Sequence, residues 1–230
     1  MNTDRQTISE RLHEAESKAL ILFEEAQKRN LICDGITELE LNKGLLDLAS
    51  EILGVKKFWH KRIVRSGANT LFPYKENPPN LLIQKDDILF FDFGPVLEDW
   101  EADIGRTYVI GDNPDKIKLR DDTVTCWDLG RRFIFDNPKS SGAEIYRHMQ
   151  SLAIQHGWEF GGEHCGHLIG FFPHERIQGE LVENYLHPQN DKKISEPDKN
   201  GNPRFWILEI HLVDRKKQIG GFYEGFVGSF

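Results

Sequence analysis

Long apolar runs are missing from this 230-residue sequence, and no stretch reaches the roughly 18 apolar residues of a membrane-spanning helix. The first residues, MNTDRQTISER, also lack the apolar segment of a secretory signal peptide, so we expect a cytoplasmic protein. Cysteine is scarce. Cys33, Cys126 and Cys165 lie far apart and form no CxxC pair, which argues against a disulfide framework and a thiolate zinc site.

An excess of basic residues is missing too. The sequence has 29 lysines and arginines against 37 acidic residues, a formal charge of −8, so it offers no electrostatic footprint for phosphate and we expect no nucleic-acid partner. What it does have is ordinary for a soluble globular protein, with 39% hydrophobic and 29% charged residues. Its length is enough to bury a substantial core.

Two helices are predicted in the first fifty residues. Apolar residues recur every three or four positions from Ile8 to Ala26, the spacing of one apolar helix face. Thr37 and Glu40 have the spacing of a capping box, and a second apolar stripe follows them as far as Leu53. Strand-like segments then follow within residues 63–111: RIVRSGANTLF, DDILFFDFGPVL and EADIGRTYVIG.

The same order of elements recurs in the rest of the chain. A helix is expected to begin near Asp115, with Val124, Trp127 and Ile134 on one face, and Ser141 with Glu144 predicts a capping box for the next helix. Three strands are then predicted, in HLIGFFPHE, RFWILEIHLVD and IGGFYEGFVGSF. The polar residues 184–204 are predicted to form a long loop.

This repeated order predicts an α+β fold built from two similar halves around one shared core. No hinge-like linker separates the halves. We therefore expect a single domain, residues 1–230, with halves of about 1–111 and 112–230. A functional site is expected where the halves meet.

Two pairs of acidic residues lie within apolar strand segments. Asp92 and Asp103 are eleven residues apart, and a hairpin centred between Leu97 and Glu98 would set them opposite each other. Glu209 and Glu224 are fifteen apart around a polar turn, and the same reasoning predicts that they face each other. Acids at the edge of a sheet that face solvent are the plainer alternative. Buried together, the four carboxylates would need a cation to stay ionised.

His167 is the histidine most suited to join these acids, because glycines flank its segment and allow close backbone approach. Carboxylates with one imidazole and no thiolate favour divalent Mn, Co, Fe or Zn. Two such ions could share bridging carboxylates and hold a water that is acidic enough to supply hydroxide. Of the other histidines, five are expected on solvent or helix faces: His13, His60, His148, His156 and His187.

With these motifs the sequence resembles the superfamily of methionine aminopeptidases, aminopeptidase P, prolidases and creatinase, which share the pita-bread fold. The resemblance covers most of the chain, corresponds to the catalytic domain alone and is nearer the aminopeptidase P branch. The family's five metal ligands, in the order Asp, Asp, His, Glu and Glu, have counterparts in DFG, ADIGRTY, GHLIG, WILEI and GFYEG, which supply Asp92, Asp103, His167, Glu209 and Glu224.

The resemblance implies a curved antiparallel sheet around a dinuclear site, and an aminopeptidase that releases the N-terminal residue of short peptides through a metal-bridged hydroxide, including residues that precede proline. It implies that Glu209 is both a metal ligand and the general base, and that His174 hydrogen-bonds the scissile peptide. Tyr74, His174 and His164 are the expected substrate-binding residues, and a homodimer is left open.

Several residues depart from the family pattern. The substrate-contacting histidine of the family corresponds to Tyr74, the position four before the metal histidine holds Glu163, and an arginine two before the last glutamate corresponds to Phe222. Two alternatives therefore stay open. One is a non-catalytic pita-bread module that binds peptides or proteins. The other is a creatinase-like hydrolase of a small carbon–nitrogen substrate.

Overall fold

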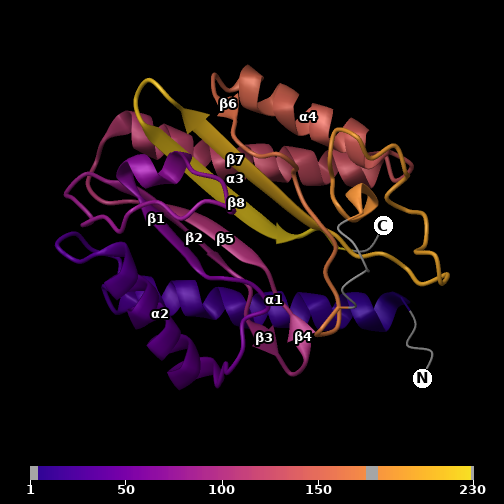
Figure 1. Ribbon diagram of the computed structural model, residues 1–230, viewed down its shortest axis with the longest axis horizontal. Helices are drawn as coiled ribbons and strands as arrows, with labels where there is room; N and C mark the ends of the chain where they lie inside the picture. Colours follow the sequence, from indigo (N-terminus) through magenta and orange to yellow (C-terminus); the bar gives the residue numbers. More distant parts are fainter. Residues whose placement is uncertain (1–4, 175–180, 229–230) are drawn as a thin grey trace.

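The computed structural model describes residues 5–174 and 181–228, in which four helices accompany a six-stranded antiparallel sheet (Figure 1). The helices are α1 (Arg5–Lys28), α2 (Glu38–Leu53), α3 (Pro114–Asp136) and α4 (Gly142–Gln155). In sheet order the strands are β1 (Ile63–Ser66), β2 (Ile88–Phe93), β5 (Ile104–Val109), β8 (Ile219–Phe226), β7 (Ile207–Asp214) and β6 (Glu159–Phe160). Strands β3 (Val96–Leu97) and β4 (Trp100–Glu101) form a separate two-stranded sheet.

The predicted α+β class and the predicted order of elements are confirmed. Strands of the first half occupy one side of the sheet and strands of the second half the other, and β5 and β8 meet in the middle. Helices α1 and α2 pack with the first set of strands, and α3 and α4 with the second (Figure 1). This arrangement is compatible with one domain of halves 1–111 and 112–230, and that division stays a prediction.

Both predicted capping boxes are present. At the start of α2, the backbone N–H of Glu40 donates to Thr37 Oγ1 at 3.2 Å, and the backbone N–H of Thr37 donates to Glu40 Oε2 at 2.8 Å. Ser141 and Glu144 repeat the arrangement at the start of α4. Each box satisfies backbone donors that have no partner inside the helix.

Helix α3 is continuous through Gly130, although a glycine weakens a helix. A Cβ at this position would lie 2.2 Å from Met149 Sδ, so the glycine allows α4 to pack closely against α3. The expected apolar face of α3 is wrong at Val124, which is 39% exposed. Trp127 and Ile134 are buried as expected.

The first acidic hairpin differs from the expected register by two residues. Asp92 pairs with Gly105 and not with Asp103, because the turn is centred between Glu98 and Asp99. Both turn residues have positive φ, at 51° and 67°, as a tight hairpin turn with the twist of its strands requires. A shift by an even number of residues keeps both aspartates on one face of the sheet.

The second acidic hairpin has the expected register. Glu209 and Glu224 are direct partners on β7 and β8. Asp214 closes the turn that joins these strands, since its Oδ1 accepts the backbone N–H groups of Lys216 and Lys217 at 3.0 and 2.9 Å. The two glutamates are therefore held side by side at the junction of the halves, where β8 pairs with β5 through Gly105 and Glu224.

Two expected strands take other forms. The segment around His167 is not a regular strand, but its carbonyl groups accept β7 backbone N–H groups: Ile207 donates to His167 at 2.9 Å and Glu209 donates to Cys165 at 3.0 Å. The last residue of that expected strand, Glu175, lies outside the described residues. The end of RIVRSGANTLF forms the 3-10 helix η1 (Gly67–Leu71).

The polar segment 184–204 is a loop, as predicted, and buries Leu186 and Ile194 in the core of the second half. Another 3-10 helix, η2 (Val182–Asn184), leads into it. Among the described helices, none combines the length and apolar character that a membrane crossing requires.

Candidate metal centre

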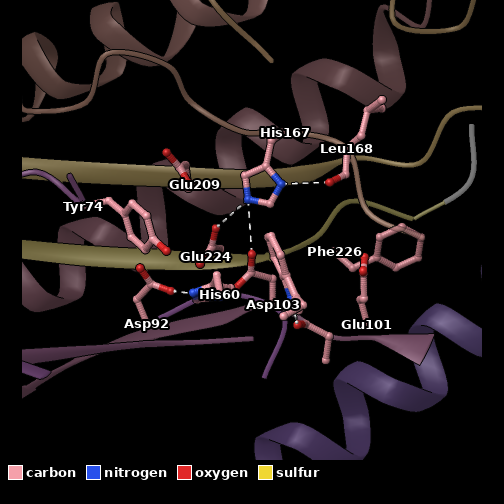
Figure 2. A network of polar contacts seen from close by, with 12 residues as sticks. His60, Tyr74, Asp92, Glu101, Asp103, His167, Leu168, Glu209, Glu224 and Phe226 are labelled. Atoms are coloured by element: carbon pink, nitrogen blue, oxygen red, sulfur yellow. Dashed lines mark hydrogen bonds and ion pairs between the residues drawn. The ribbon is translucent and has the colours of Figure 1, made fainter. Parts of the chain in front are cut away.

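Three buried carboxylates meet at the centre of the sheet (Figure 2). Asp92 lies on β2, Asp103 just before β5, and Glu224 on β8. Asp103 and Glu224 are each only 2% exposed. The opposing position on β5 is Gly105, where a Cβ would lie 2.5 Å from the Phe222 ring and 3.0 Å from Cβ of Glu224. Strand pairing thus brings together acids from both halves of the chain and leaves the room they need.

His167 lies against these acids, as predicted (Figure 2). Its Nδ1 contacts the Leu168 carbonyl oxygen at 2.9 Å, and because a carbonyl only accepts, Nδ1 carries the proton. The other ring nitrogen, Nε2, is 3.2 Å from Asp103 Oδ2 and 3.5 Å from Glu224 Oε1. An imidazole held by a backbone carbonyl in this way presents its second nitrogen as a metal ligand.

His60 is a site residue that the sequence analysis missed. It was expected on a solvent face, but its side chain is 9% exposed and its Nε2 is 3.0 Å from Asp103 Oδ1 and 3.6 Å from Asp92 Oδ1 (Figure 2). The residue lies in the connection between α2 and β1, and β1 pairs with β2 through Ile63 and Asp92. A long connection separates β1 from β2, so no local turn signal fixes where His60 falls.

Glu209 lies beside Glu224 on the sheet, but its carboxylate has a different partner. Glu209 Oε1 is 3.0 Å from Nδ1 of His164, one of the expected substrate-binding residues. The two groups of possible ligands found among the described residues both leave Glu209 out. The structure therefore brings together Asp92, Asp103, His167 and Glu224, and places Glu209 next to them in contact with His164.

His174 is held by a buried acid that the sequence analysis also missed. Its Nδ1 is 2.6 Å from Glu101 Oε2, and its backbone N–H donates to Glu101 Oε1 at 3.1 Å. Glu101 is 1% exposed and also accepts the backbone N–H of Gly170. The Trp59 ring lies 5.5 Å from both the His167 and the His174 ring. The Glu101 contacts orient the His174 ring, and its Nε2 makes no hydrogen bond with the described part of the chain.

The remaining predicted substrate residue, Tyr74, borders the acids (Figure 2). Its ring lies 5.8 Å from that of His60, and its hydroxyl accepts the backbone N–H of Lys61 at 3.2 Å. Phe222, at the position where the resemblance implies an arginine, is buried in an apolar cluster with Ile63 and Phe90. The face of the sheet beside the acids is therefore aromatic and apolar.

The acids and imidazoles strongly perturb each other's protonation. Burial on its own would lower the pKa of His60, but the carboxylates of Asp103 and Asp92 raise it to about 9. Burial likewise opposes the charge of His167, and Asp103 and Glu224 hold its pKa well above the usual value. Burial raises the pKa of Glu224 strongly, and the neighbouring charge of Asp103 adds to this. The cluster is thus anionic enough to keep both imidazoles protonated without a metal ion.

The residues present fit divalent metal ions. His60, Asp92 and Asp103 form one group whose ligand atoms lie within 4.8 Å of one another, and Asp103, His167 and Glu224 form a second. Asp103 belongs to both groups. Glu224 Oε2 is buried and accepts no hydrogen bond from the described part of the chain. Carboxylate oxygens and imidazole nitrogens without thiolates suit hard and borderline divalent ions.

Comparison with known proteins places this geometry in context. Residues 10–199 match the sequence profile of metallopeptidase family M24. Among solved structures, an X-Pro aminopeptidase from Thermotoga maritima is similar with a TM-score of 0.74 and 19% identity, over 99% of this chain and 62% of the other. An Xaa-Pro dipeptidase from Bacillus anthracis gives a TM-score of 0.72 and 22% identity, over 96% of this chain and 57% of the other.

A prolidase from Pyrococcus furiosus is similar with a TM-score of 0.69 and 17% identity, over 94% of this chain and 60% of the other. This chain thus spans about three-fifths of the length of these proteins. Curated protein sequences give no match. At these identities the similarity to solved structures shows the fold, and it agrees with the predicted pita-bread architecture.

Proposed function

The chain belongs to metallopeptidase family M24, and from that premise we propose that it is a dinuclear metallo-aminopeptidase that releases the N-terminal residue of short peptides. The observation that carries the proposal is the position of Asp103. Its two oxygens face different imidazoles, and it belongs to both groups of metal-ligand candidates. A carboxylate shared in this way suits a pair of adjacent ions.

Five residues are proposed to hold the two ions, of Mn, Co, Fe or Zn: Asp92, Asp103, His167, Glu209 and Glu224. Divalent ions there would supply Lewis acidity, which polarises a peptide carbonyl and makes water a stronger acid. Glu209 is the residue of this set whose carboxylate also contacts a histidine outside it, His164. We expect it to turn toward the other acids when ions bind, because its strand position is already opposite Glu224.

Glu209 is proposed to act as the general base. Burial opposes its charge, yet His164 and His167 hold its pKa below the ordinary value, so it is ionised at neutral pH. An ionised carboxylate can take a proton from the attacking water and return it to the leaving amine. His164 would then keep Glu209 oriented while contacting the substrate.

His174 is proposed to hydrogen-bond the oxygen of the scissile peptide. Because Nδ1–H donates to the Glu101 carboxylate at 2.6 Å, Nε2 is the ring nitrogen that can face the substrate, and it donates a hydrogen bond in the imidazolium form, in which both nitrogens carry a proton. A fixed donor aimed at developing negative charge lowers the barrier more than a mobile one, since no reorganisation is needed during the reaction. Tyr74 borders the same space and would contact the substrate.

The similar structures include an X-Pro aminopeptidase and an Xaa-Pro dipeptidase, so peptides with proline in the second position are the first substrates to test. Purified protein reconstituted with Mn or Co should hydrolyse members of a dipeptide and tripeptide panel that includes such peptides. Glu209→Gln should abolish turnover, while the surface variant Lys217→Gln should keep it. No turnover by the wild type with any of the four metals would refute the proposal.

A non-catalytic module is the second candidate, and Tyr74 and Phe222 favour it because they replace residues that contact substrate in the family. Such a module would bind peptides without metal. Calorimetry of the chelated protein with the same panel separates the two functions, since tight metal-independent binding without turnover supports the module. Creatine added to the panel tests a creatinase-like reaction, and gel filtration tests the homodimer.

A further inference from the structure

The proposed ligand set contains one histidine, but the structure holds two in matching positions. His60 comes from the first half of the chain and His167 from the second, and each faces a different oxygen of Asp103 (Figure 2). His60 Nε2 is 3.0 Å from Asp103 Oδ1, and His167 Nε2 is 3.2 Å from Asp103 Oδ2. Each oxygen of the shared carboxylate therefore has its own imidazole.

Both imidazoles are oriented by the same device. His60 Nδ1 contacts the carbonyl oxygen of the next residue, Lys61, at 2.7 Å, just as His167 Nδ1 contacts that of Leu168 at 2.9 Å. A carbonyl oxygen only accepts, so Nδ1 is the protonated nitrogen in each ring. In the neutral form, the lone pair of each Nε2 then faces the acids, which is the usual arrangement of a metal-binding histidine.

The packing around His60 leaves the ring little freedom. A Cβ at Gly94, just after β2, would lie 2.2 Å from the His60 ring, so only glycine at this position leaves space for the imidazole. The Trp59 ring, which a Cβ at Gly94 would also meet, packs edge-on against that of His60 at 4.4 Å. Trp59 is itself fixed, because its Nε1 donates to the Ala102 carbonyl oxygen at 2.9 Å. The imidazole is therefore preorganised toward the acids.

We propose that His60 is a sixth metal ligand: its Nε2, with Asp92 and Asp103 Oδ1, holds one ion, while His167 Nε2, Asp103 Oδ2 and Glu224 hold the other. The inference rests on the metal centre of the proposed function and is independent of the peptide substrate. Each ion then has one imidazole. Because imidazole suits Zn, Fe and Co better than Mn, the His60 ion should discriminate against Mn.

The first test is X-ray absorption spectroscopy of the wild-type chain, stripped of metal with a chelator and then loaded with two equivalents of Zn. Outer-shell scattering in such a spectrum reports the number of imidazole ligands per ion. The inference predicts an average of one imidazole per ion. An average of half an imidazole per ion, with two ions bound, would overturn it and leave the proposed metal centre standing. Failure to bind any ion would overturn both.

The second test uses calorimetric titration with Zn and with Mn. His60→Ala should weaken one of two binding events by about 100-fold or more, since even loss of a group that orients a ligand costs about 10- to 100-fold. The second event should change little, and the Zn-over-Mn preference of the weakened site should fall. His156→Ala is the matched control, because His156 pairs with Asp122 at 3.0 Å, away from the acids.

A substrate contact would give a different result. If His60 contacts only the peptide, His60→Ala raises KM and leaves both metal affinities and the Zn spectrum unchanged, which refutes the inference. Should the alanine variant fail to fold, His60→Gln keeps most of the side-chain volume while removing the imidazole. The wild-type spectrum decides the question without any variant.

Discussion

Stability of the metal-free chain should fall as pH rises, and His60 makes this prediction quantitative. In the folded chain the carboxylates of Asp103 and Asp92 overcome the effect of burial and raise the pKa of His60 to about 9, from an ordinary 6.5. Folding therefore favours the protonated form. Its contribution is fully present below about pH 6.5 and is lost as pH rises through about 9.

The size of the effect follows from the difference in pKa. Each pKa unit is worth about 1.4 kcal/mol, so the rise from 6.5 to about 9 corresponds to about 3 kcal/mol. Asp92 acts in the same direction at lower pH. Burial raises its pKa to about 7, so its protonated form also favours folding and this contribution is lost between about pH 4 and 7. Since the two groups interact, their contributions do not add.

The assay is urea unfolding of chelated protein at half-unit steps from pH 6 to 9.5, followed by tryptophan fluorescence. Other groups titrate in this range, so the same series on His60→Gln is subtracted. We expect the wild type to lose about 3 kcal/mol more than the variant across this range. Equal slopes for the two proteins, or a wild type that gains stability toward pH 9, would refute the electrostatic account of the site.

Three further predictions concern single positions. Gly130→Ala should lower the free energy of unfolding by about 1 to 3 kcal/mol, because its Cβ would lie 2.2 Å from Met149 Sδ; urea denaturation measures this, and unchanged stability would contradict the close packing. Thr37→Ala should cost about 1 kcal/mol through loss of the capping box, while Thr37→Ser restores it. Glu101→Gln should lower kcat by up to about 100-fold and change KM less, because the variant no longer fixes the His174 ring. A change in KM alone would indicate that Glu101 does not act through His174.

Local signals in the sequence were sufficient for several elements. The capping boxes at Thr37 and Ser141 were predictable because three-residue spacing and helix geometry fix which backbone N–H groups need a partner. The pairing of Glu209 with Glu224 was predictable because a short polar turn fixes the register of a hairpin. Such features depend on residues close together in the chain.

The register of the first hairpin was predicted two residues away from its observed position. Its sequence offers two adjacent centres for the turn, and the outcome depends on Glu98 and Asp99 accepting positive φ. No glycine or asparagine occupies these positions, so the usual signal of such a turn is missing. In the observed register both aspartates still lie on the predicted face of the sheet, but they are not directly opposite each other.

His60 and Glu101 could not be found from local patterns. His60 reaches Asp103 across 43 residues, and Glu101 reaches His174 across 73. Both contacts depend on how separate hairpins and loops pack, and neither residue sits in a motif. The sequence shows only that His60 follows Trp59 and precedes a strand, which is a weak signal. The pairing of β1 with β2 is what brings His60 to the acids.

The claim that the carboxylates form a two-ion site is tested most directly by locating the ions. Crystals of the chelated chain soaked in manganese should give two anomalous peaks about 3.5 to 4 Å apart, one on each side of Asp103. One peak would sit near Asp92 and the other near His167 and Glu224. A map without anomalous peaks among these side chains, at manganese concentrations that saturate a known two-ion enzyme, would contradict the account.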